Sequence, residues 1–399
     1  MVDSVPQGAP ALEAAEAAAL LPESAGVSAA AGTLSQWQLI GLRFSKHRLA
    51  VASLFALFVL YALAVFSEPL APYAPYARHL DYPYAPPQSV HFDLQRGVYT
   101  YALQRYVDPI TFRKQYVELP SEPLQLRFFA PGEPYELWGL IPMNRRLLSV
   151  EQREVSAVKG AAPVSSTFFL LGADRYGRDI LSRAIHGARI SLSVGVIGVF
   201  FTFVLGLCVG GLSGYAGGRT DNFIQRTIEV VNAFPQLPLW IALSALLPGD
   251  WPALSTYFAI TLLLSLLNWT GLARVVRGKI LALREEEYAV AARLLGASHA
   301  RILFRHLLPG FTSHIIVALT LSVPAVILGE TALSFLGLGL RPPIVSWGVM
   351  LQDCMDVKAV RYYPWLLTPV LLLVGTVLSF NFLGDGVRDA ADPYGSSAK

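Results

Sequence analysis

Long uncharged runs alternate with short polar segments along most of the chain. Each run approaches the roughly 20 residues that a helix needs to cross a bilayer. We therefore expect an all-α polytopic membrane protein with six transmembrane helices. The expected spans are Leu49–Phe66, Ile190–Gly211, Ile228–Leu247, Trp251–Ala273, Gly310–Leu340 and Tyr362–Gly384.

Two of these spans contain residues that disturb a membrane helix. Pro235 and Pro238 make the third span irregular, and the fifth is expected to break around Pro324 and Glu330. A carboxylate inside a span is expensive, so it must face protein or water. Glu330 is therefore a candidate for lining a translocation path through the membrane. The alternative is that its carboxylate satisfies backbone groups at a helix break near the outer interface.

Glycines recur every four residues from the second span onward, at Gly206, Gly210, Gly214 and Gly218. Small residues at this spacing allow the backbone of another helix to approach closely. We interpret the first three as a helix-packing face. Looseness at a helix end is the alternative, and Gly214 and Gly218 could already lie in a loop.

Basic residues orient the spans. Arg43, Lys46 and Arg48 precede the first span and place the N-terminus in the cytoplasm by the positive-inside rule. An even number of spans returns the C-terminus to the same side, and the basic loops 219–226 and 274–309 also fall there. The arginines of 175–189 fall outside, against the rule, which is weak beside long translocated domains.

The polar region 68–170, between the first two spans, predicts a small, mainly β extracytoplasmic insert. It opens with a Pro- and Tyr-rich stretch that we expect to be an extended linker. Val98–Tyr106 is rich in strand-forming residues, and apolar and polar residues alternate across Leu124–Phe128. Pro131-Gly132 and Pro142–Asn144 are expected to punctuate the strands. A docking or lid module is our hypothesis for its role.

Composition supports the membrane assignment, and the absence of known motifs excludes several kinds of binding and catalytic site. The chain is 54% hydrophobic and only 15% charged, and its net charge of +3 gives no reason to expect nucleic-acid binding. The sequence lacks a G-x-x-x-x-G-K-[ST] phosphate loop, an H-E-x-x-H pair and any Cys/His cluster with metal-ligand spacing. We therefore expect no catalytic residue, bound cofactor or metal. Residues 1–36, without Lys or Arg, and 394–399 are expected to be tails, the first disordered and cytoplasmic.

The segment 274–309 is too polar to cross a bilayer and is predicted to form two helices hinged at Gly296. Ser298 can cap the second helix, Arg301 and Arg305 share one helical face, and Pro309 ends it. One interpretation is a contact that receives force from another protein. The other is an ordinary amphipathic helix at the membrane surface.

Residues within this segment resemble a known loop. EYAVAARLLGASHARILFRHLLPG resembles the cytoplasmic "EAA" loop of ATP-binding-cassette (ABC) importer permeases, matching at Ala291, Ala292, Gly296, Leu308 and Pro309. Val290 stands where the family has Glu. The stretches GADRYGRDILSRAIHGARISLSVG, GETALSFLGLGLRPPIVSWGVML and FNFLGDGVRDAADP resemble the dipeptide/oligopeptide/nickel branch of that family. The similarity covers 37–66 and 171–393.

The resemblance implies a type I permease fold with its first helix and basic lead-in at 37–67, its core at 171–393 and a coupling loop at 274–309. It implies a non-catalytic subunit of the inner membrane that imports peptides. Its expected partners are the lipid bilayer, a second permease subunit, two ATPase subunits carrying ATP and Mg, and a solute-binding protein. Nickel chelates or glycosides are alternative substrates, and a non-transporting scaffold is an alternative function. The residues expected to couple to the ATPases are Glu287, Ala291, Ala292, Gly296, Arg301, Arg305 and Pro309.

Overall fold

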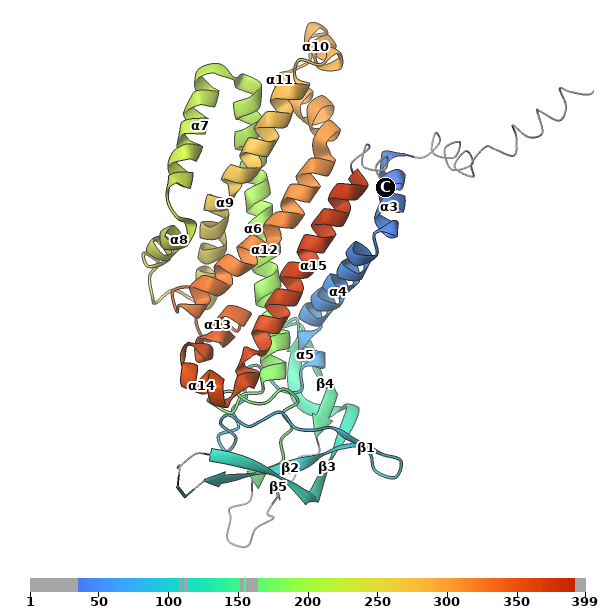
Figure 1. Cartoon of the computed structure of the whole chain (residues 1–399), viewed down its shortest axis with the longest axis vertical. Coiled ribbons are helices and arrows are strands. Elements are labelled where there is room, and N and C mark those ends of the chain that lie inside the picture. Colours follow the sequence, from blue (N-terminus) through green and yellow to red (C-terminus); the bar gives the residue numbers. More distant parts are fainter. Residues whose placement is uncertain (1–34, 108, 111–113, 151–153, 156–163, 392–399) are drawn as a thin grey trace, which may run out of the picture.

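The computed structural model describes residues 35–107, 109–110, 114–150, 154–155 and 164–391. The predicted tail 394–399, and nearly all of the predicted tail 1–36, lie outside these ranges. The described chain has two parts along its long axis, a helical part and a smaller part rich in strands at one end (Figure 1). Helix α4 precedes the strand-rich part in the sequence and helix α6 follows it. Both meet the strand-rich part at the same end of the helical part.

The helical part contains long helices joined by short ones. The described helices are α3 (Gln36–Lys46), α4 (Arg48–Val65), α5 (Ser67–Leu70), α6 (Ile180–Ala216), α7 (Gly218–Ala233), α8 (Gln236–Ser244), α9 (Ala253–Leu283), α10 (Glu287–Leu294), α11 (His299–Arg301), α12 (Thr312–Phe335), α13 (Trp347–Leu351), α14 (Val357–Tyr362) and α15 (Thr368–Ala391). Within the described residues, five helical runs are long and apolar enough to cross a membrane, at α4, α6, α9, His299–Phe335 and Pro364–Ala391. The prediction of a helical, polytopic protein is confirmed.

The third predicted span, Ile228–Leu247, is wrong as a single helix. The structure divides this stretch between α7 and α8, with Phe234 extended at ψ 136° between them. Pro235 explains the division, because its ring disfavours a helical conformation in the preceding residue and it has no N–H to donate.

The fifth predicted span is wrong in the opposite sense. Helix α12 continues through Pro324 and Glu330 and ends only at Phe335, where Gly337 adopts a positive φ of 75°. Pro324 removes only one N–H donor from the helix, and in a membrane helix neighbouring groups can satisfy the carbonyl that it leaves free, so the helix continues through it. The predicted loop 341–361 is also largely helical.

Helix α6 lies at the centre of the bundle, packed against α4, α9 and α12. It begins at Ile180, ten residues before the predicted span. Trp347 of α13 is fully buried beside it, and its Nε1 donates a hydrogen bond of 3.0 Å to the carbonyl oxygen of Ala184. Burial of this ring anchors α13 to the bundle.

The glycines of α6 face α9. A Cβ atom added to Gly206 would lie 2.8 Å from the Leu272 side chain, and one added to Gly210 would lie 2.5 Å from the Ala273 carbonyl oxygen. At Gly214 the nearest atom would be the Arg277 carbonyl oxygen, at 2.9 Å. Glycine allows the two backbones to touch directly along this line.

The strand-rich part is an antiparallel sheet in the order β1-β2-β3-β4, with a separate two-stranded pair β5-β6. The strands are β1 (His91–Asp93), β2 (Gly97–Val107), β3 (Lys114–Leu137), β4 (Ile141–Val150), β5 (Glu154–Val155) and β6 (Val164–Ser165). The first half of β3 pairs with β2 and the second half with β4. The prediction of a small β insert between the first two spans is confirmed.

Two local expectations about this insert are wrong. Pro131-Gly132 and Pro142–Asn144 do not end strands; they lie inside β3 and β4, where the register shifts between Pro131 and Tyr135. The turn lies instead at Trp138 and Gly139, both at positive φ.

The expected linker has no helix or strand over residues 71–90, but it is bound to the rest of the chain. The Tyr73 N–H donates to Ser182 Oγ at 2.9 Å, and the Tyr73 hydroxyl accepts from the Phe168 N–H at 2.9 Å.

Replacing Gly210 with Ala is expected to separate α6 from α9, because the new methyl group would overlap the Ala273 backbone. Overpacking of this kind costs about 1–3 kcal/mol. The measurement is the thermal unfolding midpoint of the purified chain in detergent. Gly271→Ala is the matched control, since no atom lies within 4 Å of its added Cβ. Equal midpoints for the two variants would contradict the prediction.

Candidate functional site

The segment between α9 and α12 projects at the end of the bundle farthest from the sheet (Figure 1). Helix α10 is separated from α11 by a tight turn in which Gly296 has a φ of 79°. The N–H of Gly296 donates to the Arg293 carbonyl and that of Ala297 to the Ala292 carbonyl, each at 3.0 Å. A positive φ favours glycine, so this residue gives the turn its shape.

One side of α10 is held by the bundle and another is open. Ala289 is fully buried in a cluster with Ile302 and Leu307, and Ala292 packs against the same cluster. Ala291 is exposed. The predicted residues Ala291 and Ala292 therefore lie on different sides of the helix, one outside and one against the bundle.

Two leucines that the sequence reasoning overlooked dominate the open side. Leu294 is 83% exposed and Leu295 88% exposed, immediately before the Gly296 turn. Adjacent large apolar side chains at the tip of a polar segment are unusual on a free surface and are typical of an interaction site. The sequence shows two adjacent leucines before Gly296, but their exposure becomes evident only from the fold.

The other predicted residues of this segment are distributed around it. Glu287 begins α10. Pro309 lies in a short 3-10 turn (Leu308–Phe311) that continues directly into α12, so the prediction that it ends the second helix is wrong. Ser298 caps α11 by accepting from the Arg301 N–H at 3.4 Å. Arg301 and Arg305 are both exposed, with Arg305 in a π-helical stretch (Ile302–Leu307).

An ion pair connects the base of this segment to the bundle. Arg277 of α9 binds both carboxylate oxygens of Asp221 at the start of α7, and Ser213 of α6 donates to the same carboxylate. The hydrogen bonds from Arg277 lower the pKa of Asp221 to about 2. Three helices thus meet at one charged group. Sequence reasoning noted the basic residues but not their acidic partner.

Glu330 lies fully buried in α12. Its carboxylate accepts from the hydroxyls of Ser334 at 2.7 Å and Ser346 at 2.8 Å, and Ser346 in turn caps α13 by accepting from the Val349 N–H. The carboxylate therefore faces protein, as expected for a charged group inside a span. Its hydrogen bonds come from serine hydroxyls and α12 does not break at Glu330, so the second interpretation, a carboxylate satisfying backbone groups at a helix break, is wrong. A role for Glu330 in lining a translocation path stays a prediction.

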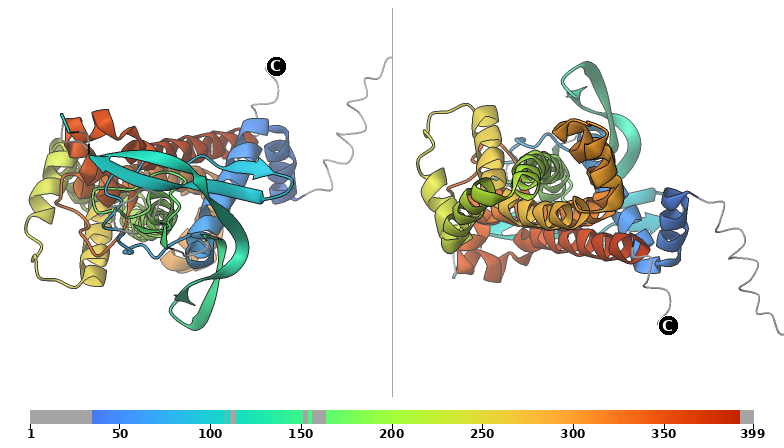
Figure 2. Two further views of the ribbon diagram at one scale, coloured as in Figure 1. Left: turned by 90° about the horizontal axis from the view of Figure 1, so that it is seen from below. Right: turned by 90° about the horizontal axis from the view of Figure 1, so that it is seen from above.

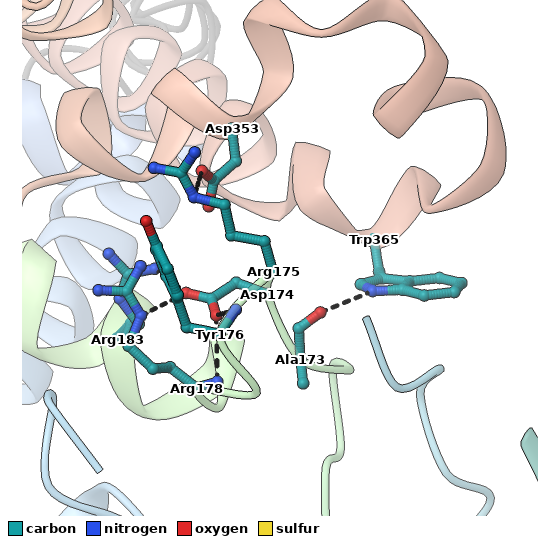
Figure 3. A network of polar contacts seen from close by, with 8 residues as sticks. All are labelled: Ala173, Asp174, Arg175, Tyr176, Arg178, Arg183, Asp353 and Trp365. Carbon is teal, nitrogen blue, oxygen red and sulfur yellow. Dashed lines mark hydrogen bonds and ion pairs between the residues drawn. The ribbon is translucent and has the colours of Figure 1, made fainter. Parts of the chain in front are cut away.

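At the opposite end of α6, the arginines of 175–189 are paired with carboxylates (Figure 3). Arg178 Nε donates to Asp174 at 2.6 Å and Arg183 donates to the same oxygen, while Arg175 pairs with Asp353 at 3.0 Å. Arg189 binds Glu68 with two bonds of 2.6 Å. Each of these four arginines therefore has a carboxylate partner within the described chain.

The residues around Asp174, which we call the Asp174 corner (173–183 with Asp353 and Trp365), also hold the start of α6 in place. Asp179 caps the helix, accepting from the N–H and the hydroxyl of Ser182 at 2.7 and 2.6 Å. Burial raises the pKa of Asp179 to about 6, and the Ser182 hydrogen bonds oppose this rise. Trp365, which precedes α15, donates to the Ala173 carbonyl at 3.1 Å (Figure 3).

A half-open cavity of about 960 Å³ lies between the sheet and the turns at 72–79 and 166–168 of the insert. Charged side chains of both signs line it, among them Arg78, Arg127 and Glu133. Among the residues that the structure describes, no group of three or more His, Cys, Asp or Glu side chains could hold a metal ion.

Comparisons with known proteins agree on one family. The model of binding-protein-dependent transport system inner membrane components matches residues 206–394, and that of the N-terminal transmembrane domain of oligopeptide transport permease C matches 35–87. Between these matches lie the sheet and most of the corner around Asp174. The shared parts are therefore the first helix and most of the bundle.

Individual relatives lead to the same group. Oligopeptide transport system permease protein OppC of Bacillus subtilis is 40% identical over 223 residues, 56% of this chain and 70% of that protein. Dipeptide transport system permease protein DppC of the same organism is 42% identical over 56% of this chain and 68% of its own length. OppC of Haemophilus influenzae is 39% identical over 58% of this chain and 73% of its own length.

Asp221→Asn is expected to loosen the junction of α6, α7 and α9, because it leaves Arg277 without a counter-charge. The expected loss is about 1–3 kcal/mol of unfolding free energy. The measurement is again the unfolding midpoint in detergent. Glu229→Gln is the matched control on the same helix; its ion pair with Arg226 joins side chains that are 55% and 81% exposed, and such pairs contribute little.

The effect of Asp221→Asn should depend on pH. The pKa of Asp221, about 2 in the folded chain, lies below the value of about 3.9 in an unfolded chain. The stabilisation is therefore complete above about pH 4 and is lost as the pH falls towards about 2. The difference between the midpoints of wild type and variant should stay constant from about pH 5 to about pH 8 and shrink below about pH 4. A constant difference down to about pH 2.5 would contradict this origin.

Proposed function

Because the chain belongs to the family of oligopeptide and dipeptide transport permeases, we propose that it is one membrane subunit of an importer that carries peptides into the cell. The observation that carries the proposal is the segment around Gly296, an exposed helical tip at one end of a bundle of spanning helices. The family model that matches residues 206–394 covers this tip and most of the bundle that bears it. Permeases of this family are non-catalytic transport subunits.

In the proposed assembly, two ATP-binding-cassette subunits bind and hydrolyse Mg-ATP, and this chain converts their closing into movement of its helices. Support comes from the open side of α10, where Ala291, Leu294 and Leu295 are available to a groove on a partner. The buried side, at Ala289 and Ala292, would transmit the displacement to the bundle. Glu287, Arg301, Arg305 and Pro309 complete the proposed coupling loop around the Gly296 turn.

Displacement of the loop would pass along α9. The loop follows α9 without a flexible linker, and Arg277 of α9 is bound to Asp221 of α7 while Arg284 donates to the Gly214 carbonyl of α6 at 3.1 Å. A change in the ATPases can drive transport only if the two conformations of the permease bind the substrate differently. Rigid connections from the loop to α6 and α7 would link the change in the ATPases to the change in the conformation of the permease.

We place the protein in the inner membrane with its loop 274–309 and both termini in the cytoplasm. The positive charge before α4 and in the loops 219–226 and 274–309 supports this orientation. The sheet then lies outside, where a solute-binding protein would deliver the peptide. A second permease subunit would supply the other half of the path. The insert, with its cavity, is proposed as a docking or lid module.

Isolation of the complex tests this function. The tagged chain, purified gently from its own membranes, should retain a second permease, ATPase subunits and a solute-binding protein. Mass spectrometry of ligand released from the binding protein should identify short peptides. Nickel chelates or glycosides there would redirect the substrate assignment. Absence of ATP-dependent uptake in vesicles containing the complete complex would favour a non-transporting scaffold.

Gly296→Val is expected to uncouple the transporter. A β-branched residue is strained at a φ of 79°, so the turn between α10 and α11 should shift and displace the leucine pair. Peptide uptake should fall at least about tenfold, as is expected when roughly 1.4 kcal/mol of coupling is lost. ATP hydrolysis should become independent of binding protein. The amount of chain in the membrane should not change.

Gly278→Val is the control for this variant. Gly278 lies in α9, within the loop 274–309 but well before the Gly296 turn; it has no atom within 4 Å of an added Cβ and lacks the positive φ. Its uptake should match that of wild type. Equal uptake by all three proteins would rule out the Gly296 turn as a coupling element.

A further inference from the structure

The turn between β3 and β4 is apolar and exposed. Residues 137–143 read LWGLIPM and contain no charge. Trp138 is 49% exposed, Leu140 79% and Ile141 49%. In Figure 2 this hairpin, coloured green-blue, projects sideways beyond the outline of the helices. An apolar turn that the chain's own helices leave uncovered requires another environment.

The height of this turn is set by its contact with α4. Trp138 Nε1 donates a 2.8 Å hydrogen bond to the carbonyl of Val65, and its ring lies 6.0 Å from that of Phe66. Helix α4 has 18 residues, so it is about 27 Å long, close to the roughly 30 Å thickness of the hydrocarbon core. Its last residue, Val65, therefore lies at the boundary between the hydrocarbon and the headgroups, and Trp138 lies beside it.

A buried arginine fixes the hairpin in this position. Arg146 of β4 is only 2% exposed and donates to the carbonyls of Ala71 at 2.8 Å and Glu68 at 3.2 Å, both in the chain that leaves α4. It also donates to the Glu133 carbonyl of β3 at 3.3 Å. The two strands and the end of the first span are thus one rigid unit, and the turn cannot swing away from the membrane boundary without breaking these bonds.

We propose that the β3–β4 turn, residues 138–141, inserts into the lipid leaflet on the insert's side of the membrane and anchors the insert there. The exposed apolar surface of α4, including Phe55 at 68% and Phe58 at 69%, continues through Phe66 to this turn. Tryptophan is favoured where hydrocarbon meets headgroups, since its ring is apolar and its N–H is polar. Exposed Arg145 follows the turn and is placed to meet lipid phosphate.

The anchor would hold the sheet at a fixed distance and tilt above the bilayer. Helices α4 and α5 connect the sheet to the membrane at one point. The β3–β4 turn would supply a second point of contact beside α4. The large cavity of the insert would then keep a constant orientation toward the membrane surface, whichever conformation the helices adopt.

Site-directed fluorescence in lipid nanodiscs tests this proposal. The full-length chain, purified with its copurifying subunits and carrying Cys208→Ala and Cys354→Ala, receives Leu140→Cys and a nitrobenzoxadiazole label. Leu94→Cys is the matched control. It is 93% exposed, also a leucine in a strand turn, and lies at β1, the opposite edge of the sheet from β4.

The two quenchers separate the outcomes. Phosphatidylcholine with a nitroxide on its headgroup should quench the label at 140 at least about twofold more strongly than that at 94, and aqueous iodide should do the reverse. Equal quenching by the lipid nitroxide at both positions would overturn the proposal. Protection of position 140 from both quenchers would also overturn it, because the turn would then be covered by protein.

Discussion

The direct contact between the backbones of α6 and α9 is the constraint on which the rest of the structure depends. Gly210 lies against the main chain of Ala273, and no larger residue fits at that point. Lipid tails offer helices no hydrophobic reason to associate, so close packing and interhelical hydrogen bonds must hold such a pair together. Ser265 of α9 adds one, donating to the Gly198 carbonyl at 2.9 Å.

Both ends of α6 extend beyond the bilayer core, and each end is held by contacts with charged side chains. The helix has 37 residues and is therefore about 55 Å long, well beyond the bilayer core. On the insert's side Arg183 meets Asp174 and Arg189 meets Glu68; at the other end Ser213 meets Asp221. With an apolar middle and polar ends, α6 is long enough to connect the two faces of the membrane.

The sequence reveals most of this plan because the bilayer imposes simple rules. Helices α4, α9 and α15 follow from run length and charge, and the small sheet follows from alternation and β-branched residues. The two prolines show what the sequence does not predict. Pro235 ends a helix and Pro324 does not, and the difference depends on the contacts that surrounding residues make with the backbone at each site. The pairs Arg277–Asp221 and Arg175–Asp353 were equally hidden, since residues about 55 and 180 positions apart carry no mark of their partnership. Leu294 and Leu295 were visible, but their exposure depends on a turn only the fold defines.

The corner around Ala173 and Asp174 also has a consequence for how the chain is made. It is built from residues synthesised early, such as Arg175 and Tyr84, and from residues that leave the ribosome some 180 to 280 positions later. Tyr84 stacks on Tyr363 with ring centroids 4.1 Å apart, Arg175 awaits Asp353, and Ala173 awaits Trp365. The base of the insert therefore cannot close until the chain has been made as far as Trp365. A chain truncated before Asp353 lacks all three late partners and leaves this corner open.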